Sequence, residues 1–152
     1  MRECAAVRTG ARGEITVVVA DDDRLVLRAL AELLEGEPDF RVVAQAANGA
    51  AAVAAAREHG AALVVTDVRM PGGGPDLVRE LVALPHRPVV AALSAQADTT
   101  TWTSMLAAGG SAYLLKGAVA GDLPGLLRRC VSGHLVVAVP GAPDVVRRLL
   151  AG

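Results

Sequence analysis

The chain has 152 residues, of which 53% are hydrophobic, and a formal net charge of −1. This size and composition predict one globular domain with a packed core and exclude a disordered chain. The balanced charge gives no electrostatic basis for binding nucleic acid through this chain, and apolar runs of about six or seven residues are too short to span a membrane.

The first 14 residues differ from the rest of the chain. Residues 1–14 lack the apolar stretch of a signal peptide and are predicted to form a flexible N-terminal extension. Cys4 lies in this extension and Cys130 in a helical pattern, so a disulfide framework is not expected. The cysteine usage therefore predicts a cytoplasmic protein.

From residue 15 onward, short apolar runs alternate with amphipathic stretches. Strands are predicted over 15–20, 41–46, 61–66, 88–93 and 111–115. Helices are predicted over 24–35, 49–59, 76–84, 99–108 and 123–132. Five βα repeats predict an α/β fold, a doubly wound parallel sheet of five strands with helices on both faces.

Capping residues support these boundaries. Asn48 and Asp98 stand where helix N-caps are expected, and Gly60 stands where the second helix ends. Asp122, with Pro124 in the first turn, opens the last of the five helices.

Two segments depart from a simple βα pattern. Residues 70–75, Met-Pro-Gly-Gly-Gly-Pro, follow the third strand, and three consecutive glycines predict a mobile or unusually shaped turn. Residues 133–143 are predicted to be a linker, and residues 144–151 a short helix. The domain is therefore expected to span 15–133, with 134–152 forming a linker and a short C-terminal helix.

Acidic residues follow two of the predicted strands. Asp21, Asp22 and Asp23 come directly after the first strand, and Asp67 directly after the third. In a doubly wound sheet these strands are neighbours, so Asp67 is expected beside Asp21 and Asp22, where ligands of open α/β sheets bind. Clustered carboxylates without a nearby His or Cys set suit Mg²⁺ better than zinc. Asp23 is interpreted as a helix N-cap.

The next two strands end in residues that suit a phosphoryl group. The fourth strand ends at Ser94 and the fifth at Lys116. One sheet edge would then offer acids, a hydroxyl and an ammonium. A metal and a lysine can offset phosphoryl charge, and a hydroxyl can bond a phosphoryl oxygen.

Four motifs together resemble a known family. VVVADDDRLVLRAL, LVVTDVRMP, VVAALSA and GGSAYLLKG are similar to the receiver domain of bacterial two-component response regulators, over roughly residues 15–133. The YLLK ending of the fifth strand is closest to the LuxR/NarL type. The resemblance implies a flavodoxin-like, CheY-like fold with strand order 2-1-3-4-5.

The resemblance also implies roles for the acidic residues. Asp67 would accept a phosphoryl group from the phosphohistidine of a sensor histidine kinase. Asp21 and Asp22 would hold Mg²⁺, or Mn²⁺, together with Asp67 and the backbone carbonyl of Arg69.

Further roles follow from the same resemblance. Lys116, Ser94 and the main-chain N–H of Ala95 would bind the phosphoryl oxygens. Tyr113 matches the aromatic residue that switches with the Ser/Thr. Arg69 and Gln96 match variable positions that set the dephosphorylation rate.

The resemblance implies a switch that controls an output, most often transcription, rather than an enzyme acting on outside substrates. DNA would be bound only through an output domain absent from this chain, homodimerisation is expected to be feasible, and no membrane partner is expected. One departure from the family is Gly74-Pro75-Asp76, which replaces the usual Asp/Asn-Gly pair after Met-Pro and affects the loop rather than the acidic pocket.

Three alternatives remain open at this point. One is a Mg²⁺-dependent aspartyl-phosphate hydrolase or phosphotransferase, although Asp67-Val68-Arg69 lacks the second acid of such enzymes. Another is a receiver-like binding module that no longer takes phosphate. A third is a stand-alone receiver that acts through protein contacts.

Overall fold

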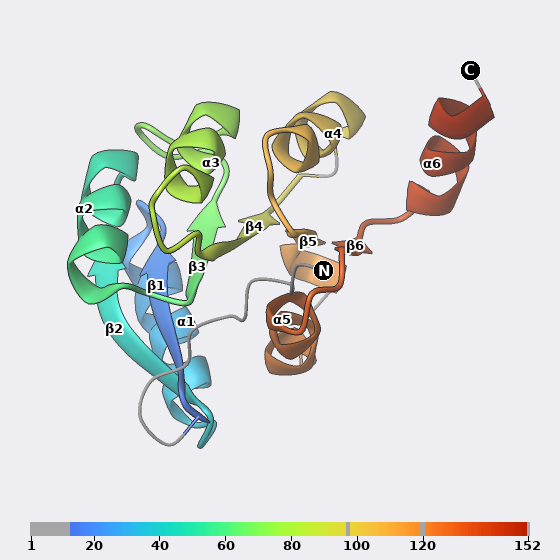
Figure 1. Ribbon diagram of the computed structural model, residues 1–152. Coiled ribbons are helices and arrows are strands. Elements are labelled where there is room, and N and C mark those ends of the chain that lie inside the picture. Colours follow the sequence, from blue (N-terminus) through green and yellow to red (C-terminus); the bar gives the residue numbers. More distant parts are fainter. Residues whose placement is uncertain (1–12, 97, 119–120, 152) are drawn as a thin grey trace, which may run out of the picture.

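The computed structural model describes residues 13–96, 98–118 and 121–151. Strands and helices alternate along the chain (Figure 1). The strands are β1 (Ile15–Ala20), β2 (Phe40–Ala46), β3 (Leu63–Asp67), β4 (Val89–Ser94), β5 (Ala112–Leu115) and β6 (Val136–Ala138). The α-helices are α1 (Arg24–Glu35), α2 (Gly49–His59), α3 (Pro75–Val82), α4 (Thr99–Ala107), α5 (Leu123–Val131) and α6 (Ala142–Ala151).

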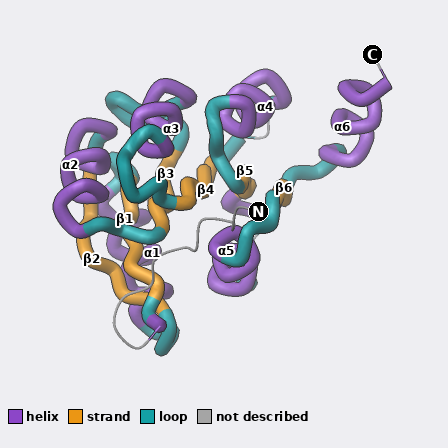
Figure 2. Tube along the Cα trace, in the orientation of Figure 1, coloured by secondary structure: helices purple, strands orange, loops and turns teal. Residues whose placement is uncertain are grey.

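The strands form one parallel sheet in the order β2-β1-β3-β4-β5-β6 (Figure 2). The predicted α/β fold and the order of the first five strands are therefore confirmed. The expectation of five strands is corrected, because the segment predicted to be only a linker contains β6. Val136, Val137 and Ala138 pair in parallel with Ala112, Tyr113 and Leu114 of β5.

Helices cover both faces of the sheet. α2, α3 and α4 pack on one face, where Ala52, Leu77 and Trp102 belong to a single buried cluster. α1 and α5 pack on the other face, through Leu27 and Leu127. Because the central strands are covered twice, they need apolar residues at every position rather than at alternate ones. This explains why β1 is apolar at every position from Val17 to Ala20.

The predicted helix boundaries rest on the expected caps. The Asp23 side chain accepts hydrogen bonds from the N–H groups of Leu25 and Val26, which confirms it as the N-cap of α1. Asn48 caps α2, and Gly60 ends that helix in the left-handed conformation that glycine adopts without strain. Asp98 caps α4, whereas Asp122 occupies the N-cap position of α5 without a side-chain cap bond.

The C-terminal segment continues from the sheet edge through β6 into α6, which projects from the domain (Figure 1). α6 begins at Ala142, two residues before the predicted start, and buries Ala142 and Val145. Both residues belong to the cluster that contains Trp102 and Tyr113. Among the helices of the described residues, none has the length and apolar character needed to cross a membrane.

Candidate functional site

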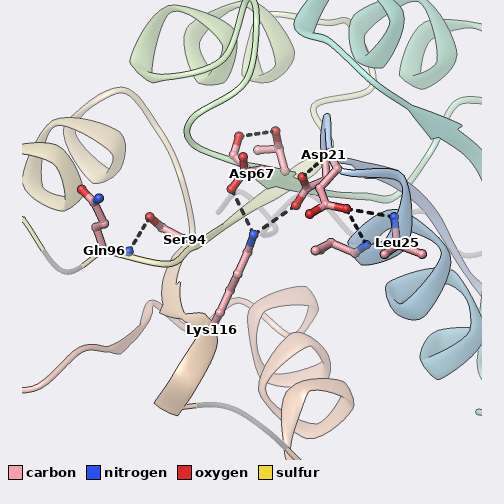
Figure 3. Close-up of polar contacts among 9 residues, drawn as sticks. Asp21, Leu25, Asp67, Ser94, Gln96 and Lys116 are labelled. Atoms are coloured by element: carbon pink, nitrogen blue, oxygen red, sulfur yellow. Dashed lines mark hydrogen bonds and ion pairs between the residues drawn. The ribbon is translucent and has the colours of Figure 1, made fainter.

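Four neighbouring strands bring polar side chains to one edge of the sheet. Asp21 follows β1, Asp67 ends β3, Ser94 ends β4 and Lys116 follows β5. All of these strands are parallel, so their carboxyl ends meet at the same edge. Figure 3 shows Asp21, Asp67 and Lys116 pointing toward one another, with Ser94 at the end of β4 and Gln96 on the loop that follows.

The acidic part of this edge consists of three aspartates. Asp21, Asp22 and Asp67 each offer a carboxylate oxygen, and these oxygens lie within 4.8 Å of one another. Asp21 and Asp67 are buried, whereas Asp22 is exposed. The backbone N–H of Asp23 donates to Oδ1 of Asp21 at 2.9 Å and fixes that side chain. An all-oxygen set of this kind fits a hard divalent cation such as Mg²⁺.

Lys116 joins two of these acids. Its Nζ lies 3.1 Å from Oδ2 of Asp21 and 3.3 Å from Oδ1 of Asp67. One ammonium therefore faces three carboxylates, which leaves the site with negative charge even when Lys116 is protonated. A bound cation would remove this excess.

The pKa directions agree with this charge balance. Burial raises the pKa of Asp67, the charge of Asp21 raises it further, and Lys116 only partly opposes the shift. Burial alone would lower the pKa of Lys116, but the hydrogen bond to Asp21 and the charges of Asp67 and Asp21 raise it above its usual value. Lys116 therefore stays charged, and Asp67 is held in an environment that disfavours its negative charge.

A second group of contacts lies on the β4 side. Ser94 is buried, and its Oγ accepts a hydrogen bond from the backbone N–H of Gln96 at 3.1 Å. The fully buried Tyr113 donates its hydroxyl hydrogen to the backbone carbonyl of Gln96 at 2.9 Å. Ser94 and Tyr113 are thus tied to the same short loop. The side chain of Gln96 itself and residue Ala95 are exposed at the rim.

Arg69 lies in the loop that follows β3. Its side chain is exposed, while its neighbours Val68 and Met70 are buried. Burial on both sides holds the Arg69 backbone close to Asp67, although the long side chain reaches solvent.

Sequence reasoning gave no role to Thr66, which is buried next to Asp67. Its hydroxyl donates to the backbone carbonyl of Asp67 at 3.1 Å. A hydroxyl inside an otherwise apolar strand was the available signal, because a buried polar group needs a partner.

The family of this chain follows from comparison with known proteins. Residues 17–128 match the response regulator receiver domain. The chain belongs to this family. The predicted receiver domain is confirmed, and a separate hydrolase or phosphotransferase is not favoured.

Individual relatives agree with this assignment. The receiver is 32% identical over 138 residues to the response regulator GacA of Pseudomonas protegens, covering 90% of this chain and 62% of GacA. It also resembles the solved signal receiver domain of the response regulator NarL from Mycobacterium tuberculosis, with a TM-score of 0.75 and 25% identity, covering 80% of this chain and 98% of the other. A LuxR-family regulator from Aurantimonas has the same fold, with a TM-score of 0.82 and 21% identity, covering 91% of this chain and 99% of that one. The predicted LuxR/NarL type is confirmed, and the receiver spans less than two thirds of the length of GacA.

Proposed function

We propose that this receiver takes a phosphoryl group on Asp67 from the phosphohistidine of a sensor histidine kinase. The observation that carries the proposal is the position of Asp67 among opposite and like charges. Its carboxylate lies 3.3 Å from Lys116 and shares a 4.8 Å cluster with Asp21 and Asp22. No acid equivalent to Asp67 stands at the end of β4 or β5, since these strands lead to Ser94 and Lys116.

The three aspartates, with the backbone carbonyl of Arg69, would hold Mg²⁺, and Mn²⁺ would use the same oxygen ligands. The close approach of the three carboxylates and the surplus negative charge support this assignment. When bound, the cation neutralises phosphoryl oxygens.

The chain's own residues would then carry the transfer. An Asp67 carboxylate oxygen forms a bond to phosphorus as the phosphorus–nitrogen bond of phosphohistidine breaks, and the electron pair leaves with the imidazole. Lys116 offsets the charge on the phosphoryl oxygens. Ser94 and the N–H of Ala95 would bond those oxygens in the product.

Ser94 and Tyr113 would change conformation when Asp67 is phosphorylated. To reach a phosphoryl oxygen, the Ser94 hydroxyl must reorient from its contact with the N–H of Gln96. Tyr113 bonds the carbonyl of that same residue, so its rotamer would respond. Arg69 and Gln96 are exposed at the rim, where their side chains would influence water access and the dephosphorylation rate.

The output is proposed by analogy with longer relatives. In this proposal, residues 15–133 form a cytoplasmic receiver that is not an enzyme toward other molecules, and residues 134–152 lead toward a DNA-binding output domain. A homodimer is compatible with the proposal. The predicted extension over residues 1–14 lies largely outside the described residues and stays a prediction.

Intact-mass measurement after incubation with Mg²⁺ and acetyl phosphate tests the proposal. The wild-type chain should gain one phosphoryl group, and Asp67→Asn should gain none because the amide cannot act as the nucleophile. Asp76→Asn provides the matched control, since Asp76 is an exposed acid on α3 that pairs with Arg79.

Two results would refute the phosphoacceptor assignment. One is a wild-type chain that never gains mass, and the other is an Asp67→Asn variant that gains as much as the wild type.

Trp102, the only tryptophan, shares a buried cluster with Tyr113, so its fluorescence should change when Mg²⁺ and beryllofluoride are added.

A further inference from the structure

The glycine-rich loop after β3, residues 70–75, contains a hydrogen-bonded turn. The N–H of Gly73 donates to the carbonyl of Met70 at 2.9 Å, and Gly72 has φ +75°. With Pro71 before Gly72, this is the arrangement of a type II turn, which needs a positive φ at its third residue. The loop therefore has a defined shape that begins one residue after Arg69.

The N-terminus of α2 seats this turn. Gly49 is the first residue of α2, and its N–H donates to the carbonyl of Pro71 at 2.8 Å. A helix leaves its first N–H groups without partners inside the helix, so the turn supplies one of them. Gly49 is buried, and this hydrogen bond joins the start of α2 to the loop after β3.

The contact leaves no room for a side chain. A Cβ on Gly49 would lie 2.0 Å from the carbonyl oxygen of Gly72 and 2.6 Å from its carbonyl carbon. On the opposite side of the contact, a Cβ on Gly72 would lie 3.2 Å from the nitrogen of Gly49. Any side chain at Gly49 must therefore push the turn away from α2.

We propose that Gly49 is a positioning residue for the metal site: its backbone contact with Pro71 and Gly72 holds the β3–α3 loop so that the Arg69 carbonyl faces the three aspartates. This inference rests on the proposed function, which makes that carbonyl a ligand. The buried side chains of Val68 and Met70 attach the loop to the core, and Gly49 holds it through a backbone contact at the start of α2. Groups that orient a ligand behind a metal site typically change metal affinity when altered.

The Mg²⁺ dissociation constant, measured by isothermal titration calorimetry, tests this role. Gly49→Ala should weaken Mg²⁺ binding by about tenfold, because the displaced turn moves the carbonyl. Circular dichroism on the same samples establishes that the compared proteins are folded. The readout is metal affinity of the folded chain, which a purely structural role would leave unchanged.

Gly74→Ala is the matched control in the same loop. Gly74 also has a positive φ, +87°, but a Cβ there meets nothing within 4 Å. This variant strains the loop backbone without touching α2, so it should bind Mg²⁺ within about twofold of wild type. If Gly74→Ala and Gly49→Ala weaken binding equally, loop strain rather than the α2 contact sets the affinity, and the inference is overturned.

A milder variant covers the case in which Gly49→Ala does not fold. Asn48→Ala removes the side-chain cap that accepts from Ala51 and loosens the same helix start without adding an atom. It should weaken Mg²⁺ binding by about twofold to fivefold. The inference is overturned if wild type binds Mg²⁺ and a folded Gly49→Ala variant binds it with the same affinity. If Gly49→Ala is unfolded, the same result for Asn48→Ala overturns the inference. A wild-type chain that binds no Mg²⁺ would instead refute the proposed metal site.

Discussion

Two ion clusters of similar composition lie at opposite ends of the sheet. At the carboxyl end, Lys116 pairs with Asp21 and Asp67. At the amino end of β2, Arg128 of α5 pairs with Glu37 and Asp39. Each cluster joins one cation to two acids that are distant from it in the sequence, so their differences isolate the effect of environment.

Burial separates the two clusters. The side chains of Asp21 and Asp67 are 3% and 10% exposed, whereas those of Glu37 and Asp39 are 34% and 38% exposed. The pKa of Asp67 is raised, chiefly by burial, while the Arg128 hydrogen bond lowers the pKa of Asp39. The dominant influence is therefore desolvation in the first cluster and ion pairing in the second.

Charge balance separates them as well. The carboxyl-end cluster has a third acid, Asp22, within reach. The amino-end cluster is completed by the Arg128 guanidinium lying 5.3 Å from the ring centre of Phe40. The additional group is thus acidic in the first cluster and aromatic in the second.

The comparison shows how the same residue types serve different purposes. At the amino end, Arg128 links α5 to the loop before β2 through two partly buried acids that remain in contact with solvent. At the carboxyl end, two buried acids and the nearby Asp22 share one ammonium, so a bound cation would offset charge that solvent screens poorly. Burial and the third acid, rather than the presence of an ion pair, distinguish the proposed binding site from a structural cluster.

Removing Lys116 should have the largest effect on stability. Lys116→Met leaves Asp21 and Asp67 without their cation, so the free energy of unfolding should fall by about 3 kcal/mol without Mg²⁺. Saturating Mg²⁺ should restore more stability in this variant than in wild type, because the competing ammonium is gone. Urea unfolding with EDTA and with Mg²⁺ measures both effects. The contrast between the clusters fails if Mg²⁺ stabilises the variant and wild type equally.

Removing Arg128 should have a smaller effect. Arg128→Met breaks ion pairs that are only partly buried and the contact with Phe40, so we expect a loss of about 1 kcal/mol. The Mg²⁺-induced stabilisation should equal that of wild type, because this cluster lies at the other end of the sheet. The same urea titrations measure it. A changed response to Mg²⁺ would show that the two ends are coupled.

The smallest effect is a pH dependence at Asp39. Its pKa is lowered in the folded chain, so the ionised carboxylate stabilises the fold above its usual pKa, and this contribution is lost as pH falls through the lowered value. Wild type should therefore exceed Asp39→Asn in stability at pH 7, and the difference should shrink below about pH 4. Thermal unfolding at both pH values measures this. A difference that grows on acidification would contradict the sign.

Much of the fold could be predicted from local pattern. The largely apolar, β-branched run of β1 and the caps at Asp23 and Asn48 indicated the bounds of their elements, because burial on both faces and helix N–H groups without partners favour particular residue types. β6 could not be predicted in the same way. Val136, Val137 and Ala138 form a strand only because the edge of β5 offers hydrogen-bond partners.

The candidate site was predictable as a set of residues but not as a set of contacts. Strand-end positions were enough to bring Asp21, Asp67 and Lys116 to one edge. The tie from Tyr113 to the carbonyl of Gln96 depends on where the loop after β4 lies, which no local pattern specifies. The three glycines after β3 predicted a mobile or unusually shaped turn, and the described loop is a turn in contact with Gly49.

The sequence by itself determined the alternation of strands and helices and the residue types at the strand ends, since each follows from periodicity and chain order. Tertiary structure decided how those residues meet. It placed Lys116 within reach of both Asp21 and Asp67, added β6 to the sheet, and brought Gly49 into contact with the turn after Arg69. These outcomes depend on burial and on contacts between segments that are distant in the sequence, and local residue patterns specify neither.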